Sequence, residues 1–206
     1  MDKSYLFICR EVIFKFFSSI CKNFWVILNK TYNSEIGDLK VYIMNEPVFK
    51  SIEVTPISGA LGALVTGVEL KNPLQEDVFA EIYKAFLEYK VIFFKDQDLN
   101  PESQLHFGRM FGQPIIYPFV KGLKDFPEIT PILKKETDLN NFGGVWHSDT
   151  TYQQQPPMAT MLYAVEVPEY GGDTEFADQC MALNYLSDGM QKFLSKQKII
   201  NISGKG

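Results

Sequence analysis

The stretch FGGVWHSDTTYQQQPPMATMLYAVEVPEYGGDTEFAD, residues 142–178, brings a polar motif, an apolar run and a glycine turn together in close succession. The apolar run at 159–167 predicts a strand, and the proline and glycines after it predict a turn into a second strand at 174–177. Within the polar motif, His147 and Asp149 lie two residues apart, so their side chains project from the same face of an extended segment. One imidazole and one carboxylate can then reach a single cation.

The pair His147 and Asp149 has two interpretations. In the first, it supplies two of the three ligands of a two-histidine, one-carboxylate site, which suits Fe(II) and leaves three coordination positions open. In the second, it marks an exposed strand end, with a solvated histidine and an aspartate that caps the next turn. Because two polar residues at this spacing also arise by chance, the spacing alone leaves both interpretations open.

Strands and helices alternate through the rest of the chain from residue 51 onward. Further strands are predicted at residues 51–58, 91–94, 128–133 and 198–203. Helices are predicted in a stretch that opens at Pro73, from Pro101 to Gly112 after an Asn100 N-cap, and at 181–194 with Ser187 as an internal cap. The elements interleave without βαβ regularity, which favours a mixed α+β architecture with a sheet-rich core and flanking helices.

The composition predicts one soluble globular domain. The 206 residues are 46% hydrophobic and 22% charged, which provides enough apolar material for one sizeable core. The formal net charge of -5 argues against nucleic-acid binding, since a phosphate-binding surface needs clustered Lys and Arg. Three cysteines without a CxxC spacing indicate neither a disulfide framework nor a zinc ribbon, so a cytoplasmic location is expected. The chain has two histidines, and His106, in a predicted helix, is expected to have a surface or packing role.

Residues 1–43 differ from the rest of the chain. The run from Tyr5 to Leu28 is rich in Phe, Ile, Val and Trp, but charged residues interrupt it, so no transmembrane helix of roughly 20 apolar residues is predicted. Its polar residues fall on one face at helical spacing, which would make an amphipathic interfacial helix, and a signal peptide is a further alternative. The favoured interpretation is an N-terminal extension foreign to the fold, with Met44 as the start of the domain.

The stretch at 142–178 resembles the taurine dioxygenase and 2,4-dichlorophenoxyacetate dioxygenase family of Fe(II)- and 2-oxoglutarate-dependent enzymes. The resemblance lies in the WHSD motif, the PP-M segment and the GGDT turn that an aromatic residue follows. Upstream, VIFFKDQDLNPESQLHFGRMFG at 91–112 is similar to the family's strand-then-helix entry, which ends in an F-G-x-P pattern. The resemblance covers about Ile52 to Gly206.

The resemblance implies a double-stranded β-helix, or jelly roll, with flanking helices, of which residues 44–206 would form the N-terminal portion of a dioxygenase domain. It also implies that His147 and Asp149 are iron ligands of the catalytic centre, and that the hydroxyl of Thr174 binds the 2-oxoglutarate carboxylate. The family's second histidine ligand and its 2-oxoglutarate-binding arginine lie downstream, on strands that this sequence does not contain. The fold is therefore expected to be incomplete.

The implied reaction couples decarboxylation of 2-oxoglutarate to succinate with hydroxylation of a small organic acid by dioxygen, with Fe(II) as cofactor and 2-oxoglutarate as cosubstrate. The loop IIYPFVKG, residues 115–122, lacks the histidine that taurine-specific members use, so a sulfonate substrate is not expected. The alternative is a catalytically inactive fragment or a vestigial metal-binding domain of the same family. Unpaired strand edges predict dimers or aggregates, and membrane association is not expected.

The sequence also predicts the environment of three aromatic residues and the backbone of two glycines. Trp146 is expected to pack beneath the metal site, and Tyr117 and Tyr152 are expected to line a pocket or to pack in the sheet. Gly171 and Gly172 are expected to adopt positive φ in a tight turn.

Overall fold

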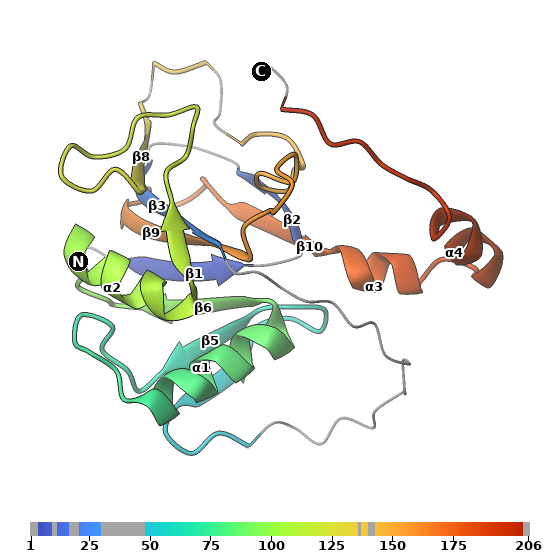
Figure 1. Cartoon of the computed structure of the whole chain (residues 1–206). Coiled ribbons are helices and arrows are strands. Elements are labelled where there is room, and N and C mark those ends of the chain that lie inside the picture. The colour runs from blue at the N-terminus through green and yellow to red at the C-terminus, as the bar shows by residue number, and fades with distance from the viewer. Residues whose placement is uncertain are drawn as a thin grey trace.

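Figure 1 shows the computed structural model of the chain, which describes residues 4–9, 12–16, 21–29, 48–135, 137–139 and 143–203. The strands are β1 (Tyr5–Cys9), β2 (Val12–Phe16), β3 (Cys21–Asn29), β4 (Glu53–Pro56), β5 (Ala63–Thr66), β6 (Val91–Lys95), β7 (Gln113–Ile115), β8 (Ile129–Lys134), β9 (Ala159–Glu166) and β10 (Thr174–Asp178). The helices are α1 (Glu76–Tyr89), α2 (Pro101–Phe111), α3 (Gln179–Asn184) and α4 (Asp188–Leu194). The predicted mixed α+β class is confirmed.

Most strands belong to one sheet with the order β4-β5-β6-β1-β9-β3-β7, in which β8 also pairs with β3. A second, two-stranded sheet pairs β10 with β2. The described pairings are antiparallel except that of β5 with β6, which is parallel. β9 lies between β1 and β3, so both of its edges are hydrogen-bonded and it offers a fixed support for side chains near its start.

The two longer helices pack on the sheet through aromatic side chains. α1 contacts β5 and β6, and α2 contacts β3 and β7. Phe86 of α1 and Phe111 of α2 are almost completely buried and meet edge to face, with ring centroids 5.7 Å apart. Phe107 meets Phe111 in the same way at 5.4 Å. Burial of each ring contributes about 1.5–3 kcal/mol, so this cluster holds the helices to one core.

α2 begins and ends where the sequence predicts. The side chain of Asn100 accepts from the Ser103 N–H at 2.8 Å, and the Ser103 hydroxyl accepts from the Asn100 N–H at 3.0 Å. This reciprocal capping satisfies two helix-end donors, and the helix closes before Gly112. α1 begins later than predicted, at Glu76 instead of Pro73, and ends at Tyr89, followed by the C-cap Lys90, whose φ of 62° is left-handed.

Strands, not a helix, form in the N-terminal segment. β1 pairs with β6 on one side and β9 on the other, and Leu6 and Ile8 are fully buried. The interfacial helix considered for this segment is therefore wrong, because β1 completes the large sheet. The boundary of the extension at residue 43 stays a prediction, and Met44 lies outside the described residues. Among the described residues no helix is both long enough and apolar enough to span a bilayer.

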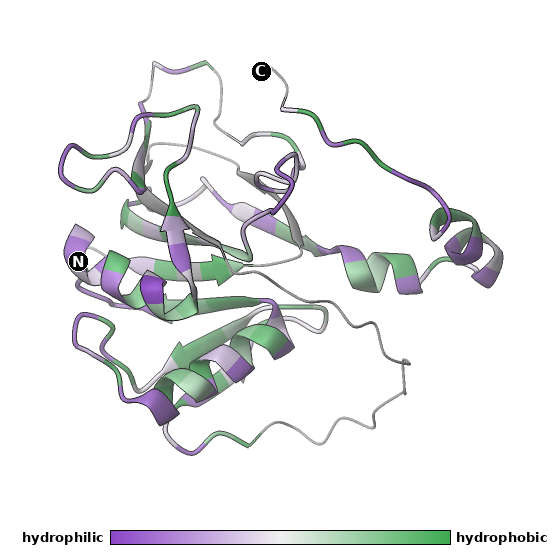
Figure 2. Cartoon of the chain, in the orientation of Figure 1, coloured by the Kyte–Doolittle hydropathy of each residue, from purple (hydrophilic) through white to green (hydrophobic). Residues whose placement is uncertain are grey.

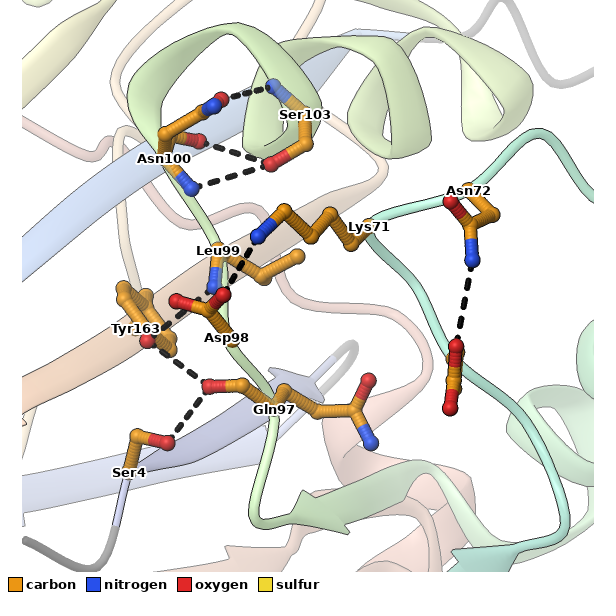
Figure 3. A network of polar contacts seen from close by, with 10 residues as sticks. Ser4, Lys71, Asn72, Gln97, Asp98, Leu99, Asn100, Ser103 and Tyr163 are labelled. Carbon is orange, nitrogen blue, oxygen red and sulfur yellow. Dashed lines mark hydrogen bonds and ion pairs between the residues drawn. The ribbon is translucent and has the colours of Figure 1, made fainter.

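A polar network around Gln97 joins the start of the chain to the middle of the sheet (Figure 3). The Gln97 carbonyl accepts from the Tyr163 hydroxyl of β9 at 2.8 Å and from the Ser4 hydroxyl. The Gln97 side chain accepts from the Leu70 N–H at 2.9 Å. Because buried polar groups are costly when unpaired, this network fixes the loop after β6 against β1 and β9.

The C-terminal segment departs from its prediction in two ways. The helix expected at 181–194 is divided into α3 and α4, because the Ser187 side chain accepts from the Met190 N–H and starts a new helix. The strand expected at 198–203 does not form, since no described strand pairs with these residues, and Ile199 and Ile200 are 83% and 85% exposed. Figure 2 shows hydrophobic residues along α3, α4 and this tail, away from the sheet.

Candidate functional site

His147 and Asp149 lie in the loop between β8 and β9, and their side chains meet. His147 Nε2 is 3.5 Å from Asp149 Oδ1, and the two side chains are 28% and 10% exposed. Asp149 begins a turn instead of continuing an extended segment, so the predicted strand geometry is only approximate here. The prediction that one imidazole and one carboxylate face the same point is nevertheless consistent with this geometry.

The hydrogen bond on the far side of the imidazole sets its tautomer. His147 Nδ1 is 2.8 Å from the carbonyl oxygen of Val145, which can only accept, so Nδ1 carries a proton. In the neutral imidazole, Nε2 then presents a lone pair toward Asp149 Oδ1, which also presents lone pairs. Two acceptors at this distance attract each other only through a proton or a cation between them, which is the property required of a pair of metal ligands.

The same contacts change the protonation of His147. Burial alone would lower its pKa, but the hydrogen bonds to the Asp149 carboxylate and the Val145 carbonyl favour the charged imidazole, so the pKa lies above its usual 6.5. A proton therefore occupies the gap at acidic pH, and a cation must compete with it.

The second carboxylate oxygen of Asp149 is held by β9. The Thr160 hydroxyl donates to Asp149 Oδ2 at 2.7 Å, and Thr160 is only 6% exposed. Ser148, between the two candidate ligands, accepts from the Gln179 side chain at 3.0 Å at the start of α3. The loop is thus tied both to the large sheet and to the C-terminal segment.

Thr150 gives the turn after Asp149 an unusual backbone. Its φ is 49°, in the left-handed region that a β-branched residue rarely adopts, and the residue is 5% exposed. Such a conformation costs on the order of 1–3 kcal/mol and persists only where surrounding contacts impose it. The strain here is located directly beside the candidate ligand.

Thr174, the predicted 2-oxoglutarate contact, is half-buried at the first position of β10. The preceding turn has the predicted geometry, because Gly171 and Gly172 have φ values of 78° and 71°. β10 runs from Thr174 to Asp178 and leads directly into Gln179, whose side chain reaches the His147 loop. The role of Thr174 stays a prediction.

A pocket of about 490 Å³ lies in the loop after β7 and is lined by residues 116–124 and Pro127. Tyr117 lines it and also packs against the buried cluster of Cys9, Val91 and Leu162, so both alternatives considered for this residue apply. The ring of Phe119 is 5.6 Å from that of Tyr117 and 5.8 Å from that of Tyr152. Burial and the nearby charges of Tyr152 and Asp149 raise the pKa of Tyr117. The Phe119 ring thus connects the pocket to Tyr152, which lies in the same loop as Asp149.

Trp146 and His106 take no part in these contacts. Trp146 is 46% exposed, so the prediction that it packs beneath the metal site is wrong. His106 is exposed on α2, which confirms a surface role. Within the described ranges no cluster of three or more His, Cys, Asp or Glu side chains could hold a metal ion.

The chain matches known dioxygenases in sequence. Residues 53–204 match the family described as "Taurine catabolism dioxygenase TauD, TfdA family". The chain is 30% identical over 146 residues to the alpha-ketoglutarate-dependent sulfate ester dioxygenase of Pseudomonas putida, and this match covers 70% of the chain and 48% of the relative. It is also 30% identical over 161 residues to the alpha-ketoglutarate-dependent 2,4-dichlorophenoxyacetate dioxygenase of Cupriavidus pinatubonensis, a match that covers 70% of the chain and 56% of that relative.

A solved structure shows the same similarity in three dimensions. It is a crystal structure from Burkholderia xenovorans of a protein assigned as an alpha-ketoglutarate-dependent taurine dioxygenase. The match has a TM-score of 0.60 and 32% sequence identity, and it covers 71% of this chain and 52% of that one. The chain spans about half the length of the curated relatives it matches.

Proposed function

The chain belongs to the taurine catabolism dioxygenase TauD, TfdA family, and on that basis we propose that it is part of an Fe(II)- and 2-oxoglutarate-dependent dioxygenase. The proposed reaction hydroxylates a small organic acid and decarboxylates 2-oxoglutarate to succinate. The described residues are proposed to be the N-terminal portion of a double-stranded β-helix, which the similarity to the solved dioxygenase structure supports.

This proposal rests mainly on the contact between His147 Nε2 and Asp149 Oδ1, which lie 3.5 Å apart. The hydrogen bond from His147 Nδ1 to the Val145 carbonyl fixes the imidazole tautomer in which Nε2 can present a lone pair to a metal. An imidazole nitrogen and a carboxylate oxygen are ligands that suit Fe(II). His147 and Asp149 therefore fit two of the ligand positions around an iron ion. When bound, the metal would supply the redox chemistry that lets dioxygen oxidise 2-oxoglutarate and the substrate. The chain's own contribution is to orient both ligands and to shield them from water.

Thr174 is proposed to donate a hydrogen bond to a 2-oxoglutarate carboxylate. Its hydroxyl is a short donor on the first residue of a strand, and a turn with two left-handed glycines fixes where that strand begins. β10 leads into Gln179, which contacts the His147 loop, so the strand and the candidate ligands are structurally linked.

The pocket in the loop after β7 supports a small organic acid as substrate. Its lining combines the apolar side chains Tyr117 and Phe119 with the basic residues Lys121 and Lys124. Apolar walls bind a hydrocarbon or ring, and ammonium groups attract a carboxylate or sulfate. The relatives are named for sulfate ester, sulfonate and phenoxy-acid substrates, each of which carries an acidic group.

A second candidate function is a metal-binding domain of this family without catalytic activity. It is favoured by the absence, within the described ranges, of a cluster of three or more ligating side chains. With two protein ligands, metal affinity would be weak, and turnover would be lost.

Succinate formation separates the two functions. Purified chain is incubated with Fe(II), 2-oxoglutarate, oxygen and, in turn, an alkyl sulfate, a sulfonate, a phenoxypropionate and an aliphatic carboxylate. The proposal predicts substrate-stimulated succinate that is lost in His147→Ala and kept in His106→Ala, a matched control at the exposed histidine. Absence of succinate with all four classes would support the inactive alternative.

A further inference from the structure

We propose that Thr160 is a positioning residue that binds one oxygen of the Asp149 carboxylate and so holds the other oxygen toward His147, where a metal would bind. This inference rests on the proposed function of the His147–Asp149 pair as metal ligands. It concerns a residue that lies outside the HxD motif and reaches it only in the folded chain.

The two oxygens of Asp149 have different partners. Oδ2 accepts from the Thr160 hydroxyl at 2.7 Å, a short distance that is typical of hydrogen bonds to a carboxylate. Oδ1 faces His147 Nε2 at 3.5 Å. Because the hydroxyl occupies a lone pair of Oδ2 and reduces its negative charge, Oδ1 is the stronger remaining donor and the oxygen on the histidine side.

Thr160 is well placed to hold this geometry. It is 6% exposed, and its backbone pairs with Cys9 of β1 and with Ile27 of β3, so it lies within the sheet and not at its edge. A β-branched side chain also has few rotamers, so its hydroxyl direction varies little. The candidate ligand, in contrast, belongs to a loop whose next residue, Thr150, has a left-handed backbone.

The expected consequence is an Asp149 carboxylate of fixed orientation. A freely rotating carboxylate could turn either oxygen toward a cation, whereas a carboxylate held by Thr160 would offer Oδ1, on the side of His147. Outer hydrogen bonds of this kind change metal affinity by about 10–100-fold in known metal sites.

The test compares Thr160→Val, which removes the hydroxyl and keeps the shape, with Thr160→Ser, which keeps the hydroxyl. A matched control is Thr130→Val, the same change at a buried threonine of β8. Two readouts are taken on the full chain: the Hε1 proton resonance of His147 without metal at one fixed pH, and the affinity for Mn²⁺ followed by the electron paramagnetic resonance of the free ion.

In Thr160→Val, we expect the His147 resonance to be displaced or broadened and the Mn²⁺ affinity to be about 10–100-fold weaker. Thr160→Ser and Thr130→Val should behave like wild type in both measurements. The His106 resonance is the internal reference and should not move. A His147 resonance in Thr160→Val that coincides with wild type would overturn the positioning role. If the wild-type chain binds no Mn²⁺, the proposed function fails for this chain, while the metal-free resonance still decides whether Thr160 orients Asp149.

Discussion

His147 is the residue whose surroundings most directly predict a measurable property. Its Nδ1 is bonded to the Val145 carbonyl and its Nε2 faces the Asp149 carboxylate, so its pKa should lie above 6.5 in the metal-free protein. Proton nuclear magnetic resonance can measure this pKa, because the chain has two histidines and His106→Gln assigns the other signal. In Asp149→Asn the His147 pKa should fall. An unchanged pKa in that variant would show that the contact is absent in solution.

The sign of the accompanying stability change follows from the raised pKa. The folded chain binds the His147 proton more tightly than the unfolded chain does. The pair therefore contributes stability that is fully present below the unfolded pKa and is lost as the pH rises through the folded pKa. Metal binding has the opposite dependence on pH, because the cation must displace that proton.

At the residue scale, the sequence predicts His147 and Asp149 because their spacing is local. Thr160 could not be predicted, since it lies 11 residues from Asp149 and meets it only after the loop closes on β9. The left-handed backbone of Thr150 could not be predicted either, because β-branched residues disfavour this conformation and nothing in the motif indicates it. The outward position of Trp146 was also missed, because an apolar residue is expected to pack inside.

Asp178 joins three elements at the end of β10. Its Oδ2 forms an ion pair with Lys90, at the end of α1, at 3.1 Å, and its Oδ1 accepts from the Cys180 and Met181 N–H groups at the start of α3. The Asp178 side chain is only 3% exposed. Loss of this carboxylate removes a helix cap and leaves the Lys90 ammonium without this partner.

Asp178→Ala should therefore reduce the free energy of unfolding by roughly 2–4 kcal/mol, measured by urea denaturation. Asp178→Asn keeps an oxygen that caps α3 and removes only the charge, so its loss should be smaller. Ser187→Ala, at the exposed cap of α4, is the reference for a simple cap and should cost about 1 kcal/mol. Equal losses in all three variants would contradict the role of the ion pair.

The reactivity of the Cys9 thiol measures whether β1 is paired within the large sheet. It is 3% exposed, and burial together with the charge of Asp149 raises its pKa far above the ordinary range of a thiol. Because the thiolate is the reactive form, Cys9 should resist iodoacetamide in the native chain, whereas the exposed Cys180 should react. Peptide mapping by mass spectrometry resolves the two sites. Equal labelling would mean that β1 is detached and that residues 1–43 are a separate extension.

Elements with local signals were predicted well, and elements defined by distant partners were not. α2 has a cap pair at Asn100 and Pro101 that any sequence analysis can detect, and β9 has a long apolar run. β1 gave no such signal, because its apolar residues fit a helix as readily as a strand until β6 and β9 pair with it. The run at 198–203 shows the converse, since strand-like residues without a described partner strand stay extended and unpaired.

At the scale of the whole molecule, the C-terminal segment carries an unpartnered apolar surface. α3 and α4 have no buried residues. The exposed apolar side chains of this segment are Leu183, Tyr185, Leu186, Met190, Phe193, Leu194, Ile199, Ile200 and Ile202. A surface of this kind is an association site or an aggregation hazard.

We therefore expect the purified chain to self-associate as its concentration rises, as measured by sedimentation velocity. A triple variant with serine at Ile199, Ile200 and Ile202 should shift the distribution toward monomer, because it removes apolar side chains that are 83–85% exposed. The same triple change cannot disturb the core, since the wild-type side chains do not contact it. A chain that stays monomeric at all concentrations would contradict the proposed association.

His147 and Asp149 are proposed to form a site for Fe(II) that accepts 2-oxoglutarate. An anaerobic titration of the chain with Fe(II) and 2-oxoglutarate tests this site, because it follows the weak visible charge-transfer band of the chelated complex. We predict a band in wild type and in His106→Ala that disappears in His147→Ala. Absence of a band in wild type, or a band of equal strength in His147→Ala, would contradict it.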